Sequence, residues 1–329
     1  MAGAVGLISA SSMRAVLSYP SLIDALQSAF SRTHLVSVPD RHHYPLISSA
    51  LDQNATLLIM PAWSDPSATS NAFIGVKIAT VFPRNNLIGL PAVSASYLLL
   101  SAETGAPLCV LDGKELTVWR TACASALAAT FLAKDQAHTL VMVGAGAMAP
   151  HLITAHIAAR PSLNTVLIWN KTAHKAAELA DQLAKDSALK GVDFKECSDL
   201  EAAVSRADIV SCATLSEVAL VEGGWLKPGV HLDLVGSFTP AMKECDDEAV
   251  RRARVFVDSS MALKESGELV GALQRGVISP QDVVGDLSEL AKGEKIGRQT
   301  DEEVTLFKSV GCALEDLATA ALIYSKLHG

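Results

Sequence analysis

The segment TLVMVGAGAMAPHLITAHIAAR, residues 139–160, decides the fold of this chain. It begins with a short β-rich apolar run, continues through the glycine turn GAGAMA and ends in a helical pattern. Gly144 allows the tight turn, Gly146 lets a ligand approach the backbone, and Ala149 lets helix and strand pack closely. This order predicts a dinucleotide-binding site, with the pyrophosphate on the free N–H groups of the helix N-terminus. The alternative is a glycine turn that binds nothing.

The end of the next strand, Thr165–Trp169, indicates which dinucleotide is bound. An Asp or Glu there would bond the ribose 2′-hydroxyl of NAD and repel the 2′-phosphate of NADP. This chain has the amide of Asn170, the cation of Lys171 and the hydroxyl of Thr172 instead. We therefore expect NADPH as the cofactor and NADH as the alternative, although Lys171 could also be an ordinary solvated lysine. The expected contacts from the turn and the strand end are Gly144, Gly146, Ala147, Met148, Asn170, Lys171 and Thr172.

Strand-like and helix-like segments alternate from about residue 139 to about residue 259. Helical patterns such as His174–Asp186 and Asp199–Arg206 separate most of the strands. This alternation is typical of βαβ crossovers and of a parallel sheet covered on both faces. The predicted fold class is α/β, with a Rossmann dinucleotide-binding domain. Its six predicted strands are Thr139–Val143, Thr165–Trp169, Val192–Glu196, Asp208–Ala213, Val230–Val235 and Val255–Asp258.

The first 116 residues follow a different pattern. An amphipathic helix over Ser21–Ser31 precedes strand-like runs separated by Gly, Pro and Asn, which favours a mostly antiparallel sheet. Near the C-terminus, a strand at Val304–Phe307 precedes a helix from about Ala313 to Leu327. We expect this tail to return to the N-terminal domain. The predicted domains are a discontinuous one of residues 1–119 with 304–329 and an inserted one of residues 120–303.

Composition excludes several classes of protein. The chain has 329 residues, half of them hydrophobic, and a net charge of −8. This acidic balance argues against nucleic acid as the main partner, because phosphate binding needs a surplus of Lys and Arg. We find no membrane-spanning run and no secretory signal. The six cysteines lie far apart without metal-ligand spacing, which predicts reduced thiols, a reducing compartment and no metal site.

Several motifs together resemble the ornithine cyclodeaminase/mu-crystallin family. The resemblance covers nearly the whole chain and is strongest to the imine-reducing members, which include bacterial pyrroline-2-carboxylate reductases and the plant reductase of the pipecolate pathway. It implies a Rossmann domain inserted in an α+β substrate-binding and dimerisation domain formed by both chain ends, and a homodimer. The reducing compartment expected from the cysteines would be the cytoplasm, or a plastid if the chain comes from a plant. The motifs are VKIATVFPRN (Val76–Asn85), ETGAPLCVLDGKELTVWRTA (Glu103–Ala122), GAGAMA (Gly144–Ala149), IWNKT (Ile168–Thr172), KPGVHLDLVGS (Lys227–Ser237) and VTLFKSVGCALED (Val304–Asp316).

Three basic residues match the family's substrate positions: Arg41, Lys77 and Arg120. A small carboxylate-bearing substrate needs such an anchor, because Arg binds a carboxylate through two N–H groups and a nearby Lys adds charge. Lys77 stands in an apolar strand, where an unpaired ammonium is unfavourable. The alternatives to substrate binding are that Lys77 extends from a strand edge to solvent and that Arg41 is a solvated surface arginine.

Arg120 is expected in the first turn of a helix capped by Thr117. A cation there opposes the helix dipole and needs an anionic partner. A substrate carboxylate or a cofactor phosphate would provide it, and a salt bridge to Asp112 or Glu115 is the structural alternative. Thr121, from the same turn, resembles the family's contact with the cofactor phosphate. Further positions that resemble family cofactor contacts are Ala213, Thr214, Ser309 and Gly311.

One departure from the family pattern concerns Phe238. Cyclodeaminases and the related alanine dehydrogenases have an aspartate where this chain has Phe238, and Phe cannot accept a proton. This favours hydride transfer to a preformed imine over deamination and cyclisation of ornithine. The acidic run Glu244–Glu248 is expected to be a solvated helix start.

These observations predict an NADPH-dependent reductase of cyclic ketimine carboxylates. Hydride transfer to C2 of Δ1-pyrroline-2-carboxylate or Δ1-piperideine-2-carboxylate would give proline or pipecolate, with Lys77 or water as the source of the imine proton. The cofactor carries the chemistry, and the protein supplies orientation and charge. The alternatives are a cyclodeaminase-type lyase, an amino-acid dehydrogenase, and a mu-crystallin-like protein that binds NADPH or a small ligand without turnover.

Overall fold

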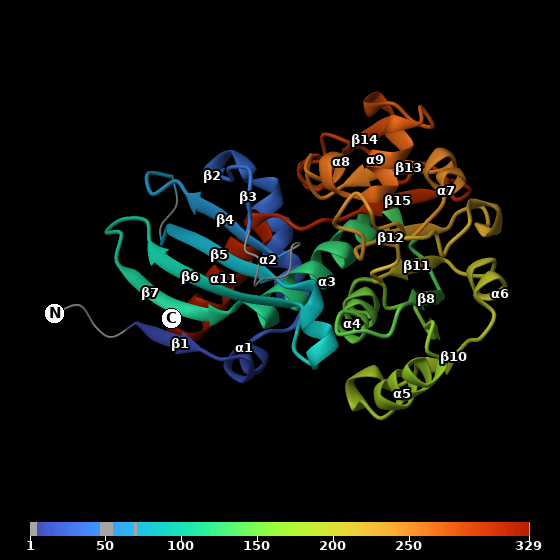
Figure 1. Ribbon diagram of the computed structural model, residues 1–329, viewed down its shortest axis with the longest axis horizontal. Coiled ribbons are helices and arrows are strands. Elements are labelled where there is room, and N and C mark those ends of the chain that lie inside the picture. Colours follow the sequence, from blue (N-terminus) through green and yellow to red (C-terminus); the bar gives the residue numbers. More distant parts are fainter. Residues whose placement is uncertain (1–4, 47–54, 69–70, 329) are drawn as a thin grey trace. The chain divides into compact units, whose positions relative to one another are not determined.

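The computed structural model describes residues 5–46, 55–68 and 71–328. They fall into two compact units, each built around one sheet (Figure 1). The terminal unit combines Met1–Arg120 with Cys312–Gly329, and the central unit is Thr121–Gly311. Within the described residues, no helix has the length and apolar character needed to cross a membrane.

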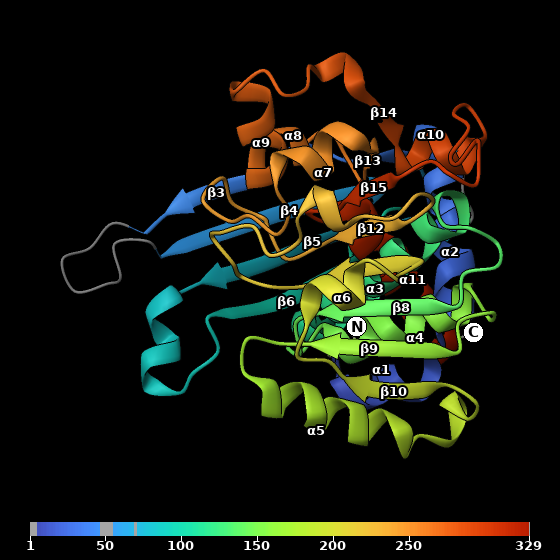
Figure 2. The same ribbon diagram turned by 90° about the vertical axis from the view of Figure 1, so that its right-hand side faces the viewer.

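The central unit is built on an eight-stranded sheet in the order β10-β9-β8-β11-β12-β15-β13-β14 (Figure 2). Neighbouring strands are parallel throughout. All six predicted strands lie in this sheet, which confirms the α/β fold class. The strands are β8 (Thr139–Val143), β9 (Thr165–Trp169), β10 (Asp193–Glu196), β11 (Ile209–Cys212), β12 (His231–Leu234), β13 (Arg254–Val257), β14 (Val283–Asp286) and β15 (Thr305–Lys308).

The position of β15 corrects the predicted domain boundaries. β15 pairs with β12 on one side and β13 on the other, and all four of its residues are buried. A fully buried run is typical of the interior of a parallel sheet, so this strand belongs to the central unit. The prediction that Val304–Phe307 returns to the N-terminal domain is therefore wrong. The boundary predicted at 303/304 lies at 311/312, and the one predicted at 119/120 lies at 120/121.

Helices connect the strands of the central unit. Several begin at an aspartate that accepts a hydrogen bond from the first turn, as Asp199, Asp246 and Asp286 do. Such a side chain satisfies one of the backbone N–H groups left without a partner at a helix start. The helices are α4 (Ala149–Ala159), α5 (Ala173–Ala184), α6 (Leu200–Val204), α7 (Asp247–Arg252), α8 (Ala262–Glu265), α9 (Gly267–Gln274) and α10 (Leu287–Lys292).

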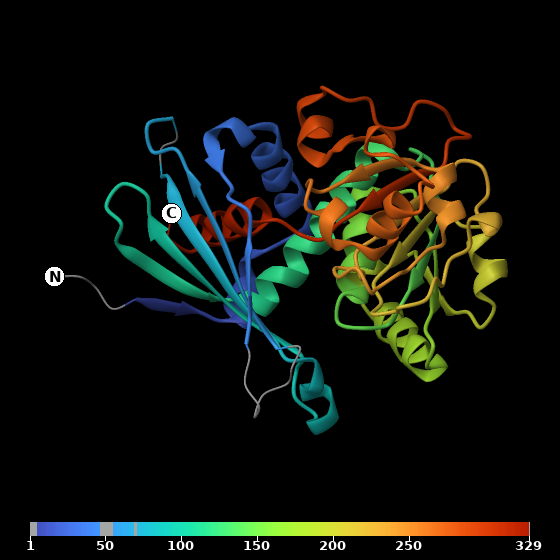
Figure 3. The same cartoon turned by 45° about the horizontal axis from the view of Figure 1, so that its top comes forward.

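The terminal unit is built on a sheet in the order β1-β7-β6-β5-β4-β2, with β3 paired to β4. β4 to β7 form the predicted antiparallel array, and helix α11 (Ala313–His328) packs against β4, β5 and α2 along one face of it (Figure 3). The remaining elements are β1 (Gly6–Ile8), α1 (Ala10–Val16), α2 (Tyr19–Ser31), β2 (Val36–Ser37), β3 (His42–Pro45), β4 (Thr56–Ser64), β5 (Phe73–Val81), β6 (Val93–Ser101) and β7 (Pro107–Asp112).

Helix α3 begins earlier than the sequence predicted. It spans Gly113–Leu132, and the Oδ1 of Asp112 accepts a hydrogen bond from the backbone N–H of Glu115 at 2.9 Å. The predicted cap, Thr117, lies inside the helix, where its hydroxyl donates to the carbonyl of Gly113 at 2.7 Å. Arg120 and Thr121 therefore lie in the interior of α3 rather than in its first turn. An aspartate is at least as good an N-cap as a threonine, so the earlier start is physically reasonable.

Candidate active site

The glycine turn after β8 has the geometry of a pyrophosphate cradle. Gly144 has a φ of +112°, and a Cβ on it would stand 2.7 Å from the carbonyl oxygen of Ala213. A Cβ on Gly146 would meet nothing within 4 Å, so the backbone there faces open space. Ala149, the first residue of α4, is fully buried against the sheet. The turn therefore packs tightly on its inner side and leaves Gly146 free to contact a phosphate group.

The end of β9 is joined to this turn by Asn170. Its Oδ1 accepts a hydrogen bond from the backbone N–H of Ala145 at 3.1 Å, and its Nδ2 donates to the carbonyl of Thr172 at 2.9 Å. The side chains of Lys171 and Thr172 are exposed. A neutral amide thus stands where a carboxylate would repel a 2′-phosphate, and a cation follows it. Of the turn residues, Ala147 is exposed and Met148 is half-buried.

Glu244 organises the loops that follow β11 and β12. Its Oε1 accepts hydrogen bonds from the backbone N–H and the hydroxyl of Thr214 at 2.7 and 2.9 Å, and its Oε2 accepts from the N–H of Gly236 at 2.8 Å. The side chain is fully buried, and burial raises the pKa of its carboxyl. The prediction of a solvated helix start is therefore wrong at Glu244, because α7 begins only at Asp247. Thr214, a predicted cofactor contact, is held in place by this carboxylate.

Lys308 is a buried lysine that was not predicted from the sequence. Its Nζ lies 3.6 Å from Oε2 of Glu268 and 4.0 Å from Oε2 of Glu244, and all three side chains are fully buried. Glu268 also accepts a hydrogen bond from the backbone N–H of Glu244 at 2.8 Å. A lysine at the end of a wholly buried strand was the available signal, since such an ammonium needs a carboxylate nearby.

Asp258 holds the loop that follows β15. Its Oδ2 accepts hydrogen bonds from the hydroxyl of Ser309 at 2.9 Å, from the backbone N–H of Val310 at 2.7 Å and from that of Gly311. Ser309 and Gly311 are predicted cofactor contacts, and Ser309 is almost fully buried. The carboxyl ends of parallel strands are where open α/β sheets bind their ligands. Buried carboxylates thus fix the backbone at the carboxyl ends of β11, β12 and β15.

The terminal unit brings together Lys77 and Arg120, two of the three predicted substrate residues. Lys77 Nζ lies 2.9 and 2.7 Å from the two carboxylate oxygens of Asp316. Arg120 donates from Nε to Asp316 at 3.1 Å and from Nη1 to Glu315 at 2.7 Å. Lys77 is 4% exposed, Arg120 is 5% exposed, and both carboxylates are fully buried. We refer to these four residues as the buried ion cluster.

The ion pairs of Arg120 differ from the structural alternative considered from sequence. Arg120 pairs with Glu315 and Asp316 of α11. Glu115 instead accepts two hydrogen bonds from Arg14, at 2.8 and 2.9 Å, and one from Nε1 of Trp119 at 2.8 Å. The partners of Arg120 come from α11, 195 and 196 positions further along the chain. Glu315 and Asp316 are members of the buried ion cluster that were not predicted from the sequence, although the last family motif contains them.

Burial and charge act in opposite directions on the two cations. Burial lowers the pKa of Lys77 to about 8, against the raising effect of Asp316. Burial also lowers the pKa of Arg120, but Asp316 and Glu315 outweigh it and leave that pKa above its usual value. Tyr97, paired with Lys77 in the sheet register, is also buried, and its hydroxyl has no hydrogen-bond partner within the described part of the chain. A Cβ on Gly75 would collide with this hydroxyl.

Arg41, the third predicted substrate residue, immediately precedes β3 and is half-buried. In the sheet register, His42 stands opposite Ile59, and Met60 stands opposite Lys77. Continued by one residue, the register sets Arg41 beside Met60, two strands from Lys77. Two strand spacings are roughly 10 Å, a distance that the two long side chains can largely bridge.

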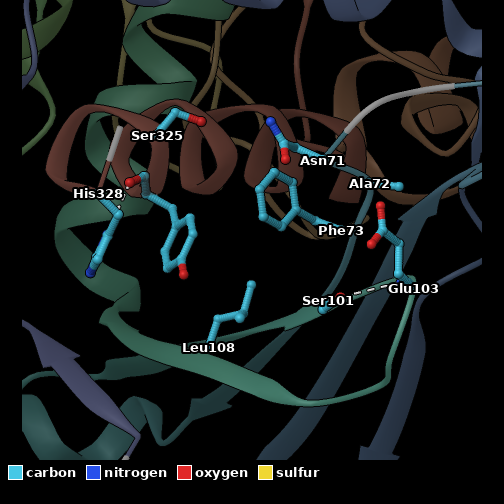
Figure 4. A pocket seen from close by; sticks show the side chains of 9 residues that line it. Asn71, Ala72, Phe73, Ser101, Glu103, Leu108, Ser325 and His328 are labelled. Atoms are coloured by element: carbon cyan, nitrogen blue, oxygen red, sulfur yellow. Dashed lines mark hydrogen bonds between the residues drawn. The ribbon is translucent and has the colours of Figure 1, made fainter. Parts of the chain in front are cut away.

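The cavity drawn in Figure 4 lies elsewhere in the terminal unit. It has a volume of about 310 Å³, and Phe73, Glu103, Tyr324 and His328 are among its lining residues. None of the predicted site residues and no member of the buried ion cluster lines it. Among the described residues, no group of His, Cys, Asp and Glu is arranged to hold a metal ion.

The parallel sheet and its glycine turn define a Rossmann-type dinucleotide-binding protein. The profile of the ornithine cyclodeaminase/mu-crystallin family matches residues 7–329, so the chain belongs to this family. It is 45% identical over 325 residues to Protein SAR DEFICIENT 4 of Arabidopsis thaliana, with 98% of each chain covered. It is 35% identical over 324 residues to a Δ1-pyrroline-2-carboxylate reductase of Colwellia psychrerythraea, covering 98% of this chain and 99% of that one.

A solved structure extends this similarity to three dimensions. It is that of Thermococcus litoralis Δ1-pyrroline-2-carboxylate reductase in complex with NADH and L-proline. The TM-score is 0.90 at 32% identity, and the match covers 98% of this chain and 97% of that chain. The family resemblance of the sequence motifs is confirmed over residues 7–329.

Proposed function

We propose that this protein reduces cyclic 2-carboxy ketimines, Δ1-pyrroline-2-carboxylate and Δ1-piperideine-2-carboxylate, to proline and pipecolate with NADPH. It is an NAD(P)H-dependent oxidoreductase that acts on a C=N bond. The observation that carries the proposal is the buried ion cluster of Lys77, Arg120, Glu315 and Asp316, in a chain whose other unit carries the glycine turn. Two of the similar proteins described above are named as Δ1-pyrroline-2-carboxylate reductases, which supports this reaction class.

The charge of the buried ion cluster suits a substrate that carries both signs. Two cations face two carboxylates, so the four ionised groups sum to zero. A cyclic imino acid has one carboxylate, and its nitrogen carries a cationic N–H once it has accepted a proton. Arg120, together with Arg41, would bind its carboxylate, since guanidinium groups match carboxylate geometry. The anionic side of the cluster would face the iminium N–H.

Lys77 is the residue to which we assign the imine proton. With a pKa of about 8, its ammonium is mostly protonated at neutral pH and can still release a proton. The bound dinucleotide supplies the hydride. The chain itself binds and orients the substrate, excludes water through burial, and holds the proton at Lys77 Nζ. Phe238, half-buried after β12, provides no carboxylate for deamination.

The cofactor contacts proposed here are those predicted from sequence. The open backbone at Gly146, with Ala147 and Met148, would hold the pyrophosphate, and Asn170, Lys171 and Thr172 would face the 2′-phosphate of NADPH. Thr121, Ala213, Thr214 and Ser309 complete the set. The neutral amide of Asn170 is the basis for preferring NADPH over NADH.

We also propose a homodimer formed through the outer face of the antiparallel sheet. Trp63 on β4 and Ile78 on β5 point away from α11 and are 39% and 44% exposed, beside the half-buried Ile59 and Ile74. An apolar face of this kind typically marks an interaction surface. A Trp63→Lys variant should shift the mass measured by light scattering from dimer to monomer. The six cysteines are all free, which agrees with the cytoplasm, or a plastid in a plant, as the compartment.

The test of the function is the absorbance decay of NADPH with each of the two imines, beside NADH and beside ornithine with NAD. NADPH-dependent turnover of either imine would support the proposal and rank the ring sizes. Ammonia release from ornithine without imine turnover would replace it with a lyase, and turnover of a 2-oxo acid with an amine would indicate an amino-acid dehydrogenase. Fluorescence quenching by an aromatic acid without any turnover would indicate a binding protein.

A further inference from the structure

Asp316 contacts both cations of the buried ion cluster. It lies in the first turn of α11 and is fully buried. Its Oδ1 accepts from Lys77 Nζ at 2.9 Å and from Arg120 Nε at 3.1 Å, and its Oδ2 lies 2.7 Å from Lys77 Nζ. We propose that Asp316 is the positioning residue that fixes the Lys77 ammonium and the Arg120 guanidinium for proton donation and carboxylate binding. This inference rests on the function proposed above.

The donor geometry shows what Asp316 leaves for a substrate. A lysine ammonium has three N–H groups, and one carboxylate can occupy at most two of them. The third N–H of Lys77 is therefore directed by the position of Asp316. On Arg120, Asp316 occupies Nε and Glu315 contacts Nη1, which fixes the plane of the guanidinium.

The charges around Lys77 give Asp316 a second role, in the protonation of the ammonium. The charged and titratable groups that face Lys77 are Asp316 and Glu315 from α11, Arg120 from α3 and Tyr97 from β6. Burial and Arg120 lower the pKa of Lys77, while Asp316 and Glu315 raise it. Asp316 is the larger of the two raising influences, and its carboxylate is in direct contact with Nζ. Without its charge, Lys77 would lose its proton at a lower pH.

The experiment compares Asp316→Asn with the matched control Glu315→Gln, each as the full chain with NADPH and the imine. In Asp316→Asn, the alkaline limb of the kcat/KM profile should move to lower pH by about one unit or more, with a roughly 10- to 100-fold loss at pH 8. Glu315→Gln removes the contact of Glu315 with Arg120 and only the smaller of the two raising influences on Lys77, so it should raise KM and move the alkaline limb much less than Asp316→Asn does. Asp316→Glu should retain the limb, because it retains the charge, and lose kcat.

Two results would overturn the assignment. One is an equal loss at every pH in Asp316→Asn, which would indicate a structural role alone. The other is the same shift of the limb in Glu315→Gln. The Lys77 signal should also be titrated by NMR in protein labelled at lysine Cε, with Lys77→Arg used for assignment. This titration needs no turnover. If the wild type reduces no imine, the proposed function fails. A lower pKa of Lys77 in Asp316→Asn would then still support the role of Asp316. An unchanged pKa of Lys77 would overturn that role.

Discussion

Each unit of the molecule buries one lysine among carboxylates, and the two arrangements differ. In the terminal unit, Lys77 Nζ lies 2.7 Å from Asp316, and Arg120 adds a second cation. In the central unit, Lys308 Nζ is 3.6 and 4.0 Å from Glu268 and Glu244. Those two carboxylates make their shorter bonds to backbone N–H groups. The carboxylates therefore hold cationic side chains in the terminal unit and the backbone in the central unit.

Buried charge is therefore expected to serve a different purpose in each unit, namely ligand binding in the terminal unit and fixation of loops in the central unit. A cation held by a carboxylate side chain can share its remaining N–H groups with a ligand. A carboxylate that accepts from Thr214 and Gly236 instead fixes the loops along which a dinucleotide would lie. Loss of a charge in the terminal unit should therefore affect turnover first. Loss of a charge in the central unit should affect folding first.

The largest expected effect is on turnover in Lys77→Met. Without the ammonium, imine reduction should fall by about 10³-fold, which corresponds to roughly 4 kcal/mol in the barrier. Asp316 keeps its contact with Arg120, so the free energy of unfolding should fall by less than the roughly 3–5 kcal/mol expected when a buried ion pair loses one partner and no other cation remains. Steady-state kinetics and urea unfolding measure the two quantities. A Lys77→Met variant with a much lower free energy of unfolding but wild-type turnover would contradict the comparison.

Lys308→Met should give the opposite pattern. It leaves Glu244 and Glu268 buried with no cation, and the free energy of unfolding should fall by about 3–4 kcal/mol. The double variant Lys308→Met/Glu268→Gln should recover part of this loss, because one of the two charges is then removed. Urea unfolding of both variants beside the wild type provides the measurement. An unchanged midpoint in Lys308→Met would show that the lysine is not needed for charge balance.

Asn170→Asp tests whether the central unit selects the dinucleotide. A carboxylate oxygen can still accept the hydrogen bond from Ala145, so the glycine turn should keep its shape. The new charge should repel a 2′-phosphate and raise KM for NADPH by roughly 10- to 100-fold, with a smaller change for NADH. Lys171→Ala is the control, since it removes a cation without adding a charge. Equal changes for both cofactors would argue against a role of this strand end in selection.

The last expected effect concerns stability in acid. Burial lowers the pKa of His231 to about 3, against about 6.5 in the unfolded chain. Between about pH 6.5 and about pH 3, the imidazole of His231 therefore binds a proton in the unfolded state and not in the folded state. Stability should therefore fall as pH falls from 6.5, by up to about 1.4 kcal/mol per pH unit. His231→Asn can still bond to Thr305 and should flatten this slope. Urea midpoints at pH 6.5, 5.5 and 4.5 distinguish the two proteins, and parallel slopes would contradict the assignment.

The central sheet could be predicted from the sequence because the pattern that indicates it lies in residues close together along the chain. A strand, a glycine turn and a helix follow one another between residues 139 and 160, and the same alternation repeats. The place of β15 could not be predicted in this way, because a buried run of four residues does not indicate which strands it will pair with. Its neighbours β12 and β13 are set by the whole sheet.

The two cations of the buried ion cluster could be singled out from the sequence, and its two anions could not. Lys77 and Arg120 stood out because both match substrate positions of the family, and because Lys77 is a charge in an apolar strand and Arg120 a cation expected at a helix start. Asp316 did not, since an acidic pair at a helix start is also typical of a solvated first turn, and its partner Lys77 lies 239 positions away. Glu244 was misjudged for the same reason, because the acidic residues after it are typical of a solvent-facing helix start.

The central position of β15 has a consequence for how the protein is made on the ribosome. β12 and β13 are not hydrogen-bonded to each other, and the strand between them is the last of the sheet in chain order. Until residues 305–308 have been synthesised, both strands present unpaired edges, and such edges attract other chains. The nascent central sheet is therefore expected to depend on protection by chaperones until its last strand emerges, and a truncation before β15 should aggregate rather than fold.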